Sequence, residues 1–262
     1  MPQKTLQIAI LNLMPLKQAT EADFLRIFAN SPLPMTIDWI KIKNHISKNT
    51  SQEYLNTHYK NFEDIRDTPY DGFIITGAPV ELLEYEAVTY WTELQEIMNW
   101  AHEHVPSTLY ICWAAQAALY HFYGIPKYPL SRKMFGIFTH RVNDAAIPLV
   151  NGFDTVFYAP HSRHTEIRKA DILRVPELTL LTESPEAGVH IVTARGGRDI
   201  FITGHSEYAP DTLHTEYHRD LNKGLPIAMP ANYYIDNDPA KGIAFQWRDD
   251  AIRLYINWLL SF

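Results

Sequence analysis

The chain has 262 residues, 46% of them hydrophobic and 20% charged, with a formal net charge of −7, which is typical of a globular protein with a large core and excludes a disordered or fibrous chain. This acidic balance argues against nucleic acid and membrane surfaces as partners. Because the sequence has no apolar run of about 20 residues and no signal-peptide pattern at its start, we expect a cytoplasmic protein.

Strand and helix patterns alternate along the first half of the chain. The predicted order is strand, helix, strand, a polar stretch of helix and loop, strand, helix, strand and helix, over residues 7–13, 20–28, 35–42, 44–66, 71–77, 89–104, 108–111 and 114–122. Thr20 to Asp23 has the spacing of a capping box, which predicts that the first helix begins there, with Phe24, Leu25, Ile27 and Phe28 on its apolar face. Such alternation predicts parallel strands with helices on both faces of the sheet.

The pattern changes in the second half of the chain. Val189–Ala194 and Asp199–Thr203 flank a glycine-containing turn, which predicts an antiparallel hairpin attached to the sheet. From Glu207 onward we expect a polar loop and helix, and then a terminal amphipathic helix over 251–262 with Ile252, Tyr255, Ile256 and Leu259 on one face. No repeat or linker marks a boundary, so the expected architecture is a three-layer α/β fold in one domain, 1–262.

Cys112 is the only cysteine, which excludes an intrachain disulfide and a site with several cysteine ligands. It comes directly after a predicted strand, at the start of a helix of small residues. In an open parallel sheet, ligands bind at the carboxyl ends of the strands, and a helix N-terminus there stabilises a thiolate. Free cysteine is also a common core residue, so position alone leaves a nucleophile and a packing role both open.

Two further strand ends carry candidate partners for this thiol. His205 and Glu207 follow the last predicted strand, and a cysteine activated by an imidazole that a carboxylate orients is a catalytic triad. The loop at Gly77 permits close backbone approach, so its amide and that of Trp113 could share an oxyanion. Sequence spacing by itself does not show that these residues meet.

Seven blocks of the chain together resemble the MetA family of homoserine O-acyltransferases, within the class I glutamine amidotransferase-like superfamily. They are residues 8–15, 70–72, 76–79, 112–117, 123–127, 159–163 and 203–208. The resemblance implies a flavodoxin-like, mostly parallel sheet and an enzyme of methionine or cysteine biosynthesis. It also implies that Cys112 forms an acyl-thioester, that His205 accepts the proton and that Glu207 completes the triad.

The same resemblance implies a substrate site and an acyl donor. Lys133, Ser162 and Arg219 match the substrate-binding positions of the family, and an arginine suits a substrate carboxylate. Glu81 stands where acetyl-using members carry glutamate and succinyl-using members carry glycine. A glutamate there would fill space and repel the free carboxylate of a succinyl group, so we expect acetyl-CoA as cosubstrate and no permanently bound cofactor.

The acceptor and the assembly stay open at the level of sequence. The chain starts at its first core strand, without the N-terminal segment of typical family members, and short members are associated with serine acetylation. L-serine therefore competes with L-homoserine as the acceptor, and a homodimer is expected from the resemblance.

Four other functions are alternatives to an acetyl-CoA-dependent O-acetyltransferase. They are a succinyl-CoA-dependent homoserine O-succinyltransferase, an amidase or hydrolase with the same triad, a metallohydrolase and a non-catalytic binding module. A zinc site could involve His161 and His164, or His214 and His218 with Glu216 between them, but the second set lacks the His-Glu-x-x-His order. We therefore expect no metal.

Overall fold

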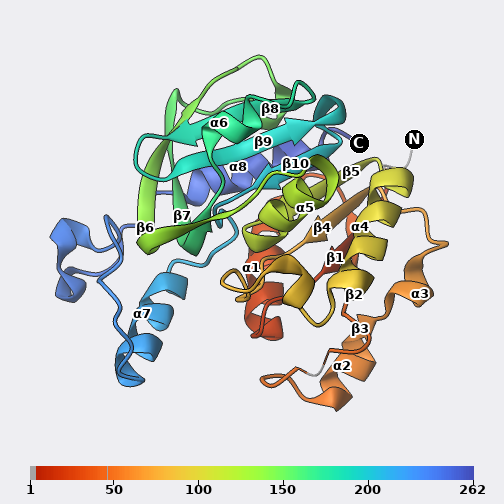
Figure 1. Ribbon diagram of the computed structural model, residues 1–262, viewed down its shortest axis with the longest axis horizontal. Coiled ribbons are helices and arrows are strands. Elements are labelled where there is room, and N and C mark those ends of the chain that lie inside the picture. The colour runs from red at the N-terminus through yellow and green to blue at the C-terminus, as the bar shows by residue number, and fades with distance from the viewer. Residues whose placement is uncertain (1–3, 46) are drawn as a thin grey trace.

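The computed structural model describes residues 4–45 and 47–262, so the predictions for residues 1–3 and Ile46 fall outside the described residues. The described strands form one sheet in the order β3-β2-β1-β4-β5-β10-β9-β8-β6-β7 (Figure 1). The strands are β1 Leu6–Leu11, β2 Met35–Ile40, β3 Tyr59–Lys60, β4 Gly72–Ile75, β5 Ser107–Ile111, β6 Tyr128–Val142, β7 Val156–Glu166, β8 Leu178–Ser184, β9 Gly188–Ala194 and β10 Asp199–Ile202.

One half of this sheet is parallel and the other antiparallel. β3, β2, β1, β4, β5 and β10 pair in parallel, and in the centre Ile10 of β1 pairs with both Trp39 of β2 and Ile74 of β4. β10, β9, β8, β6 and β7 pair antiparallel. The predicted parallel strands and the predicted hairpin of β9 and β10 are thus confirmed.

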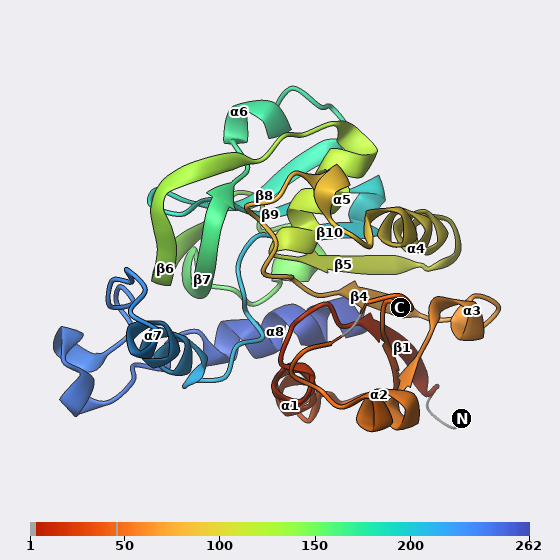
Figure 2. The same ribbon diagram turned by 60° about the horizontal axis from the view of Figure 1, so that its bottom comes forward.

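The helices cover both faces of the sheet. The α-helices are α1 Lys17–Phe28, α2 Gln52–His58, α3 Phe62–Ile65, α4 Trp91–His104, α5 Trp113–Tyr123, α6 Lys169–Ile172, α7 Thr212–Asn222 and α8 Arg248–Leu259. Short 3-10 helices lie at Tyr85–Ala87, Pro148–Val150, Arg195–Gly197, Ile235–Asn237 and Pro239–Lys241. Because strand side chains alternate between faces, Ile8 and Ile10 pack against α1 and α8, whereas Ala9 and Leu11 face α4 and α5 (Figure 2). The three-layer α/β prediction is confirmed.

The predicted start of the first helix is wrong. α1 begins at Lys17, after Leu16, three residues before the expected cap. Thr20 donates its hydroxyl hydrogen back to the Leu16 carbonyl at 3.3 Å, and the Asp23 carboxylate accepts from the distant Ala209 amide instead of capping its own helix. Leu25 is 51% exposed, so it does not belong to the buried face. The side chains of Thr20 and Asp23, which the local pattern assigned to a helix cap, therefore make other hydrogen bonds, and that of Asp23 is a tertiary contact.

Sequence periodicity misses four strands, which are the two-residue β3, within the stretch 44–66 expected to be helix and loop, and the strands β6, β7 and β8. β6 contains polar residues along much of its length, and its outer half is only partly buried, so no clear alternation marks it. β6 and β7 form a long pair beside α7 (Figure 1). A third apolar cluster, which includes Phe135, Ile137, Tyr233 and Trp247, joins this pair to the residues after α7. β6, β7 and β8 extend the antiparallel half beyond the predicted hairpin and bring Ser162 to the site.

No helix in residues 4–45 or 47–262 combines the length and apolar character that a membrane span requires.

Candidate active site

Cys112 lies in a sharp turn between β5 and α5. Its backbone has φ 51° and ψ −113°, in the left-handed half of conformational space that non-glycine residues rarely adopt. Its amide donates to the Ile202 carbonyl of β10 at 2.6 Å, which holds the turn against the neighbouring strand. Such strained strand-to-helix turns present nucleophiles above a sheet. Cys112 is 8% exposed and stands at the N-terminus of α5.

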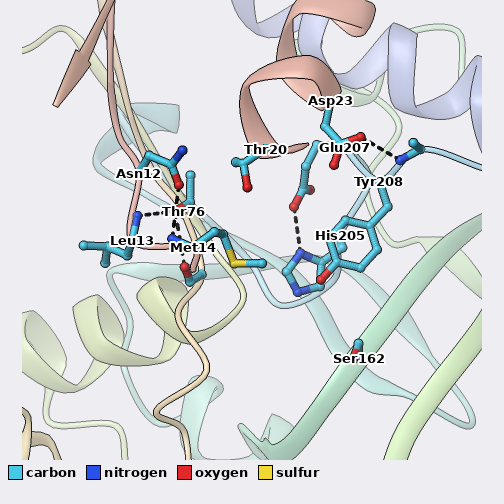
Figure 3. A network of polar contacts seen from close by, with 12 residues as sticks. Asn12, Leu13, Met14, Thr20, Asp23, Thr76, Ser162, His205, Glu207 and Tyr208 are labelled. Carbon is cyan, nitrogen blue, oxygen red and sulfur yellow. Dashed lines mark hydrogen bonds and ion pairs between the residues drawn. The ribbon is translucent and has the colours of Figure 1, made fainter. Parts of the chain in front are cut away.

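The ring of His205 lies between a carboxylate and the region of Cys112. Its Nδ1 is 2.7 Å from Oε1 of Glu207, and the Tyr208 ring stacks on it at 4.1 Å between centroids (Figure 3). A Cβ built on Gly77 would be 3.2 Å from Cβ of Cys112 and 3.4 Å from Cε1 of His205. The glycine backbone therefore fits between cysteine and histidine, and it has no side chain to separate them.

The electrostatics of this group favour a charged imidazole. Burial opposes the charge on His205, but Cys112 and the Glu207 carboxylate, by charge and by hydrogen bonding, raise the pKa of the ring well above its ordinary value. A buried imidazolium between a thiolate and a carboxylate is the resting form of many cysteine nucleophiles, because each charge stabilises its neighbour.

Helix α1 supports the loop that carries His205 and Glu207. Arg26 donates to the Glu207 carbonyl at 2.6 Å. The Asp23 carboxylate, which Figure 3 shows beside Glu207, accepts from the Ala209 amide at 3.0 Å. Burial and the nearby Glu207 carboxylate raise the pKa of Asp23 to about 7. This second carboxyl group behind the histidine is one that sequence analysis missed, because a separation of 186 residues leaves no local signal.

Two backbone amides near the thiol are free to bind an oxyanion. Within the described chain, neither the Gly77 nor the Trp113 N–H group donates to another protein group. Gly77 follows β4 and Trp113 opens α5, so the two amides border Cys112 from different elements. Unpaired amides at such a position can stabilise the tetrahedral intermediates of acyl transfer.

The three predicted substrate-binding side chains converge on one carboxylate, Glu216 of α7. Lys133 Nζ is 2.6 Å from Glu216 Oε1, Ser162 Oγ is 2.9 Å from Oε2, and Arg219 Nη2 is 3.4 Å from Oε1. Tyr208, whose ring stacks on His205 at 4.1 Å between centroids, links this cluster to the triad electrostatically, because burial and then the charges of Glu216 and Glu207 raise its pKa well above its ordinary value.

Sequence analysis noted Glu216 only as a residue between two histidines. Glu216 lies three residues before Arg219 on a helix, and this spacing could have indicated an ion pair between the two side chains. Of those histidines, His214 contacts the Tyr234 hydroxyl through Nδ1 at 2.9 Å, and its ring lies tilted at 4.3 Å from the ring of His218.

Glu81 lies in the loop that begins at Gly77, where it is half-buried. Burial lowers the pKa of the nearby Lys127, and the carboxylates of Glu84 and Glu81 oppose this shift. Glu81 is thus close to a cation and shares a loop with the glycine that contacts the triad. No hydrogen bond joins Glu81 to the described residues of the triad.

Comparisons with known proteins agree on a family and on a fold. The family model described as "Homoserine O-succinyltransferase" matches residues 2–262. A homoserine O-acetyltransferase of Bacteroides thetaiotaomicron is 60% identical over 99% of this chain and 85% of its own length. One of Brevibacillus brevis is 56% identical over 98% of this chain and 84% of its own length. A solved glutamine amidotransferase of Thermotoga maritima superposes with TM-score 0.65 at 13% identity, covering 99% of this chain and 98% of its own.

Proposed function

The chain belongs to the homoserine O-succinyltransferase family and is an O-acyltransferase, and from this premise we propose that it transfers an acetyl group from acetyl-CoA to the side-chain hydroxyl of L-homoserine through an acetyl-Cys112 intermediate. The observation that carries this proposal is the meeting of Cys112 with the His205–Glu207 pair, at the strained turn after β5. The relatives named homoserine O-acetyltransferase support the donor and the acceptor.

The first half-reaction builds the intermediate. The Cys112 thiolate attacks the carbonyl carbon of acetyl-CoA, and the Gly77 and Trp113 amides stabilise the oxyanion that forms. The bond from this carbon to the coenzyme A sulfur then breaks, and the protonated His205 gives its proton to the leaving thiolate. One thioester replaces another, so the step is nearly thermoneutral.

The second half-reaction consumes the intermediate. His205, now neutral, accepts the proton of the acceptor hydroxyl as its oxygen attacks the acetyl-thioester. The carbon–sulfur bond breaks, the Cys112 thiolate returns and the O-acetyl ester leaves. Glu207 holds Nδ1 of the ring through the 2.7 Å contact, which directs the other ring nitrogen at the reacting groups.

The cluster around Glu216 supports an amino-acid acceptor. An α-amino acid carries one ammonium and one carboxylate, and the cluster offers one carboxylate beside the cations of Lys133 and Arg219. We assign Glu216 to the ammonium group, Arg219 and Lys133 to the carboxylate, and Ser162 to the polar wall between them. An acceptor that lacks either charge would leave part of this cluster unpaired.

The half-reactions provide a direct test. Intact-protein mass spectrometry after mixing with acetyl-CoA alone should show one added acetyl group, which peptide mapping places on Cys112, while Cys112→Ala should stay unmodified. Added L-homoserine should discharge the group as O-acetylhomoserine. A thiol that stays free while product forms would contradict the covalent route.

Further arms of the same experiment separate the alternatives. Stronger discharge by L-serine would overturn the acceptor, and faster loading by succinyl-CoA would overturn the donor. Rapid loss of the acetyl group to water without an amino acid would indicate a hydrolase.

A further inference from the structure

Arg163 of β7 is a buried cation that the proposed reaction does not use. It is 2% exposed, and it donates from Nε to Nδ1 of His161 at 3.3 Å, from Nη1 to the Thr165 carbonyl at 2.6 Å and from Nη2 to the Ala187 carbonyl. All three acceptors are uncharged. Glu166, the nearest carboxylate along the strand, lies 3.6 Å from Arg168 instead. A buried charge without a counter-ion is costly, so this guanidinium requires an anion nearby.

The histidines beside Arg163 form an uncharged cluster. His140, His161 and His190 are buried, and their nearest ring nitrogens lie within 4.8 Å of one another. Burial is the main reason that the pKa of His140 falls to about 3 and that those of His161 and His190 fall well below the ordinary value. These rings therefore neither share nor balance the charge of Arg163.

The protons in this cluster also argue against a metal site. Nδ1 of His161 accepts from Arg163, so its proton is on Nε2, which lies 3.0 Å from Nε2 of His140. His140 in turn donates from Nδ1 to the Phe138 carbonyl at 3.0 Å. The lone pair of His161 is occupied by a cation, and a divalent ion would add charge beside it. His140 and His161 thus form a hydrogen-bonded chain that orients Arg163, whereas His190 contacts the Thr182 hydroxyl through Nδ1 at 3.0 Å and its Nε2 has no partner among the described residues.

Hydrogen bonds connect Arg163 to the turn that carries Cys112. The Thr165 carbonyl that accepts from Arg163 also accepts from the side-chain Nε2 of Gln116 at 3.4 Å, and the backbone N–H of Gln116 donates to the Cys112 carbonyl at 3.2 Å. The guanidinium therefore lies against the first turn of α5. Burial lowers the pKa of Arg163, and Cys112, ahead of Glu166, opposes this shift.

The other titratable groups that interact with Cys112 are His205 and Tyr208, with Glu207 behind them. Of all these groups, Arg163 alone keeps its positive charge irrespective of proton transfer.

We propose that Arg163 is a positioning residue that stabilises the Cys112 thiolate through its buried, otherwise uncompensated charge. This inference rests on the proposed function only in taking Cys112 as the nucleophile. His205 loses its charge whenever it protonates the leaving group, and Arg163 then preserves a cation beside the thiol. The role predicts that charge at this position matters more for thiol reactivity than for folding.

Alkylation by iodoacetamide tests the proposal without any substrate, and it reports on Cys112 alone because the chain has one cysteine. In Arg163→Met we expect the alkylation rate at neutral pH to fall at least about tenfold and the pH midpoint of the reaction to rise, as when a neighbouring opposite charge is removed. Arg163→Lys should keep most of the rate.

Arg198→Met is the matched control, because Arg198 also binds backbone carbonyls, at 3.2 and 3.3 Å, but before the start of β5. An unchanged rate and midpoint in a folded Arg163→Met protein with a lowered melting temperature would assign Arg163 a structural role only and overturn the proposal. If Arg163→Met does not fold, Arg163→Gln removes the charge and keeps a donor for the carbonyls, and the same outcomes apply.

Acetyl transfer to Cys112 is measured separately. Loss of alkylation in Arg163→Met together with no acetyl-enzyme in the parent would contradict the proposed function and leave this inference standing. A normal acetyl-enzyme in the parent together with an unaltered alkylation rate in Arg163→Met would contradict the inference about Arg163 and leave the proposed function standing.

Discussion

At Gly77, a single hydrogen in place of a side chain allows Cys112 and His205 to meet. A methyl group there would lie 3.2 Å from Cβ of Cys112, which is a tight contact, and 3.4 Å from Cε1 of His205, so it would press Cys112 by a few tenths of an ångström. Cys112 itself holds a backbone conformation that costs roughly 1–3 kcal/mol in other proteins. At the scale of single residues, the site therefore depends on one position without a side chain and one strained position.

At the same scale, we expect donor choice to depend on one side chain, Glu81. Glu81→Gly should raise the ratio of kcat/KM for succinyl-CoA to that for acetyl-CoA at least about tenfold, because it removes volume and a repelling charge. Glu81→Gln, which removes only the charge, should give an intermediate ratio, and Glu84→Gln in the same loop serves as the control. An unaltered ratio in Glu81→Gly would refute the assignment of this residue to the acyl pocket.

Acceptor binding is expected to depend on Glu216. Glu216→Gln should raise KM for L-homoserine about tenfold or more, since a hydrogen bond to a charged group is worth about 1.5–3 kcal/mol. Loading of the enzyme by acetyl-CoA alone should change little, which separates binding of the acceptor from general damage. Glu103→Gln, on the exposed face of α4, provides the control. Equal losses in both half-reactions would argue against the assignment.

Among the elements, three strand ends and two helices assemble the site. β4 leads to Gly77, β5 to Cys112 and β10 to His205, and these parallel strands are neighbours in the sheet. Their carboxyl ends therefore meet, as ligand sites in open α/β sheets require. Helix α1 then holds the loop after β10 through Asp23 and Arg26, and α7 supplies Glu216.

The contact from α1 predicts a pH-dependent contribution to stability. Because the pKa of Asp23 is raised to about 7 in the folded chain from an ordinary 3.8, the folded state holds a proton that the unfolded state releases between these values. The contribution of Asp23 is thus present at acidic pH and is lost as the pH rises toward 7. At about 1.4 kcal/mol per pH unit, the loss is at most about 4 kcal/mol.

Urea unfolding at pH 5, 6, 7 and 8 measures this contribution. Asp23→Asn lacks the titration, so its stability relative to the parent should increase with pH across the window. Asp249→Asn, whose parent side chain is 76% exposed, is the control. A difference between parent and Asp23→Asn that stays constant over these four pH values would contradict the expectation.

At the scale of the whole molecule, one sheet joins all parts of the site. Apolar clusters on both of its faces include residues of the same strands, β1, β4 and β5. We therefore propose that residues 1–262 form a single domain. The homodimer expected from the family resemblance stays a prediction, which sedimentation equilibrium would check.

A single domain should unfold in one calorimetric transition. At about 0.7 kcal/mol per residue near 60 °C, the unfolding enthalpy of 262 residues is roughly 180 kcal/mol, and the van't Hoff enthalpy should approach it. Scans at two rates control for irreversible unfolding. Two resolved transitions, one for the parallel and one for the antiparallel half of the sheet, would show that the halves are separate domains.

The sequence by itself determined the elements with strong periodicity and the candidate nucleophile. Apolar runs such as 108–111 predicted buried strands because local hydrophobic patterning and strand geometry have the same physical origin. The order of these elements implied a parallel sheet, and that sheet implied strand-end positions for Cys112 and His205. The family resemblance, and not periodicity, singled out Lys133, Ser162 and Arg219.

Only the tertiary structure decided which of these residues meet. Arg26 and the Glu207 carbonyl are 181 residues apart, and Lys133 and Glu216 are 83 apart, so no local pattern records either contact. The partly buried β6 gave no clear period, yet it carries Lys133 and pairs with the strand of Ser162 and Arg163. Local propensity specifies an element, but the charges around a thiol depend on chain segments that only packing of the whole sheet brings together.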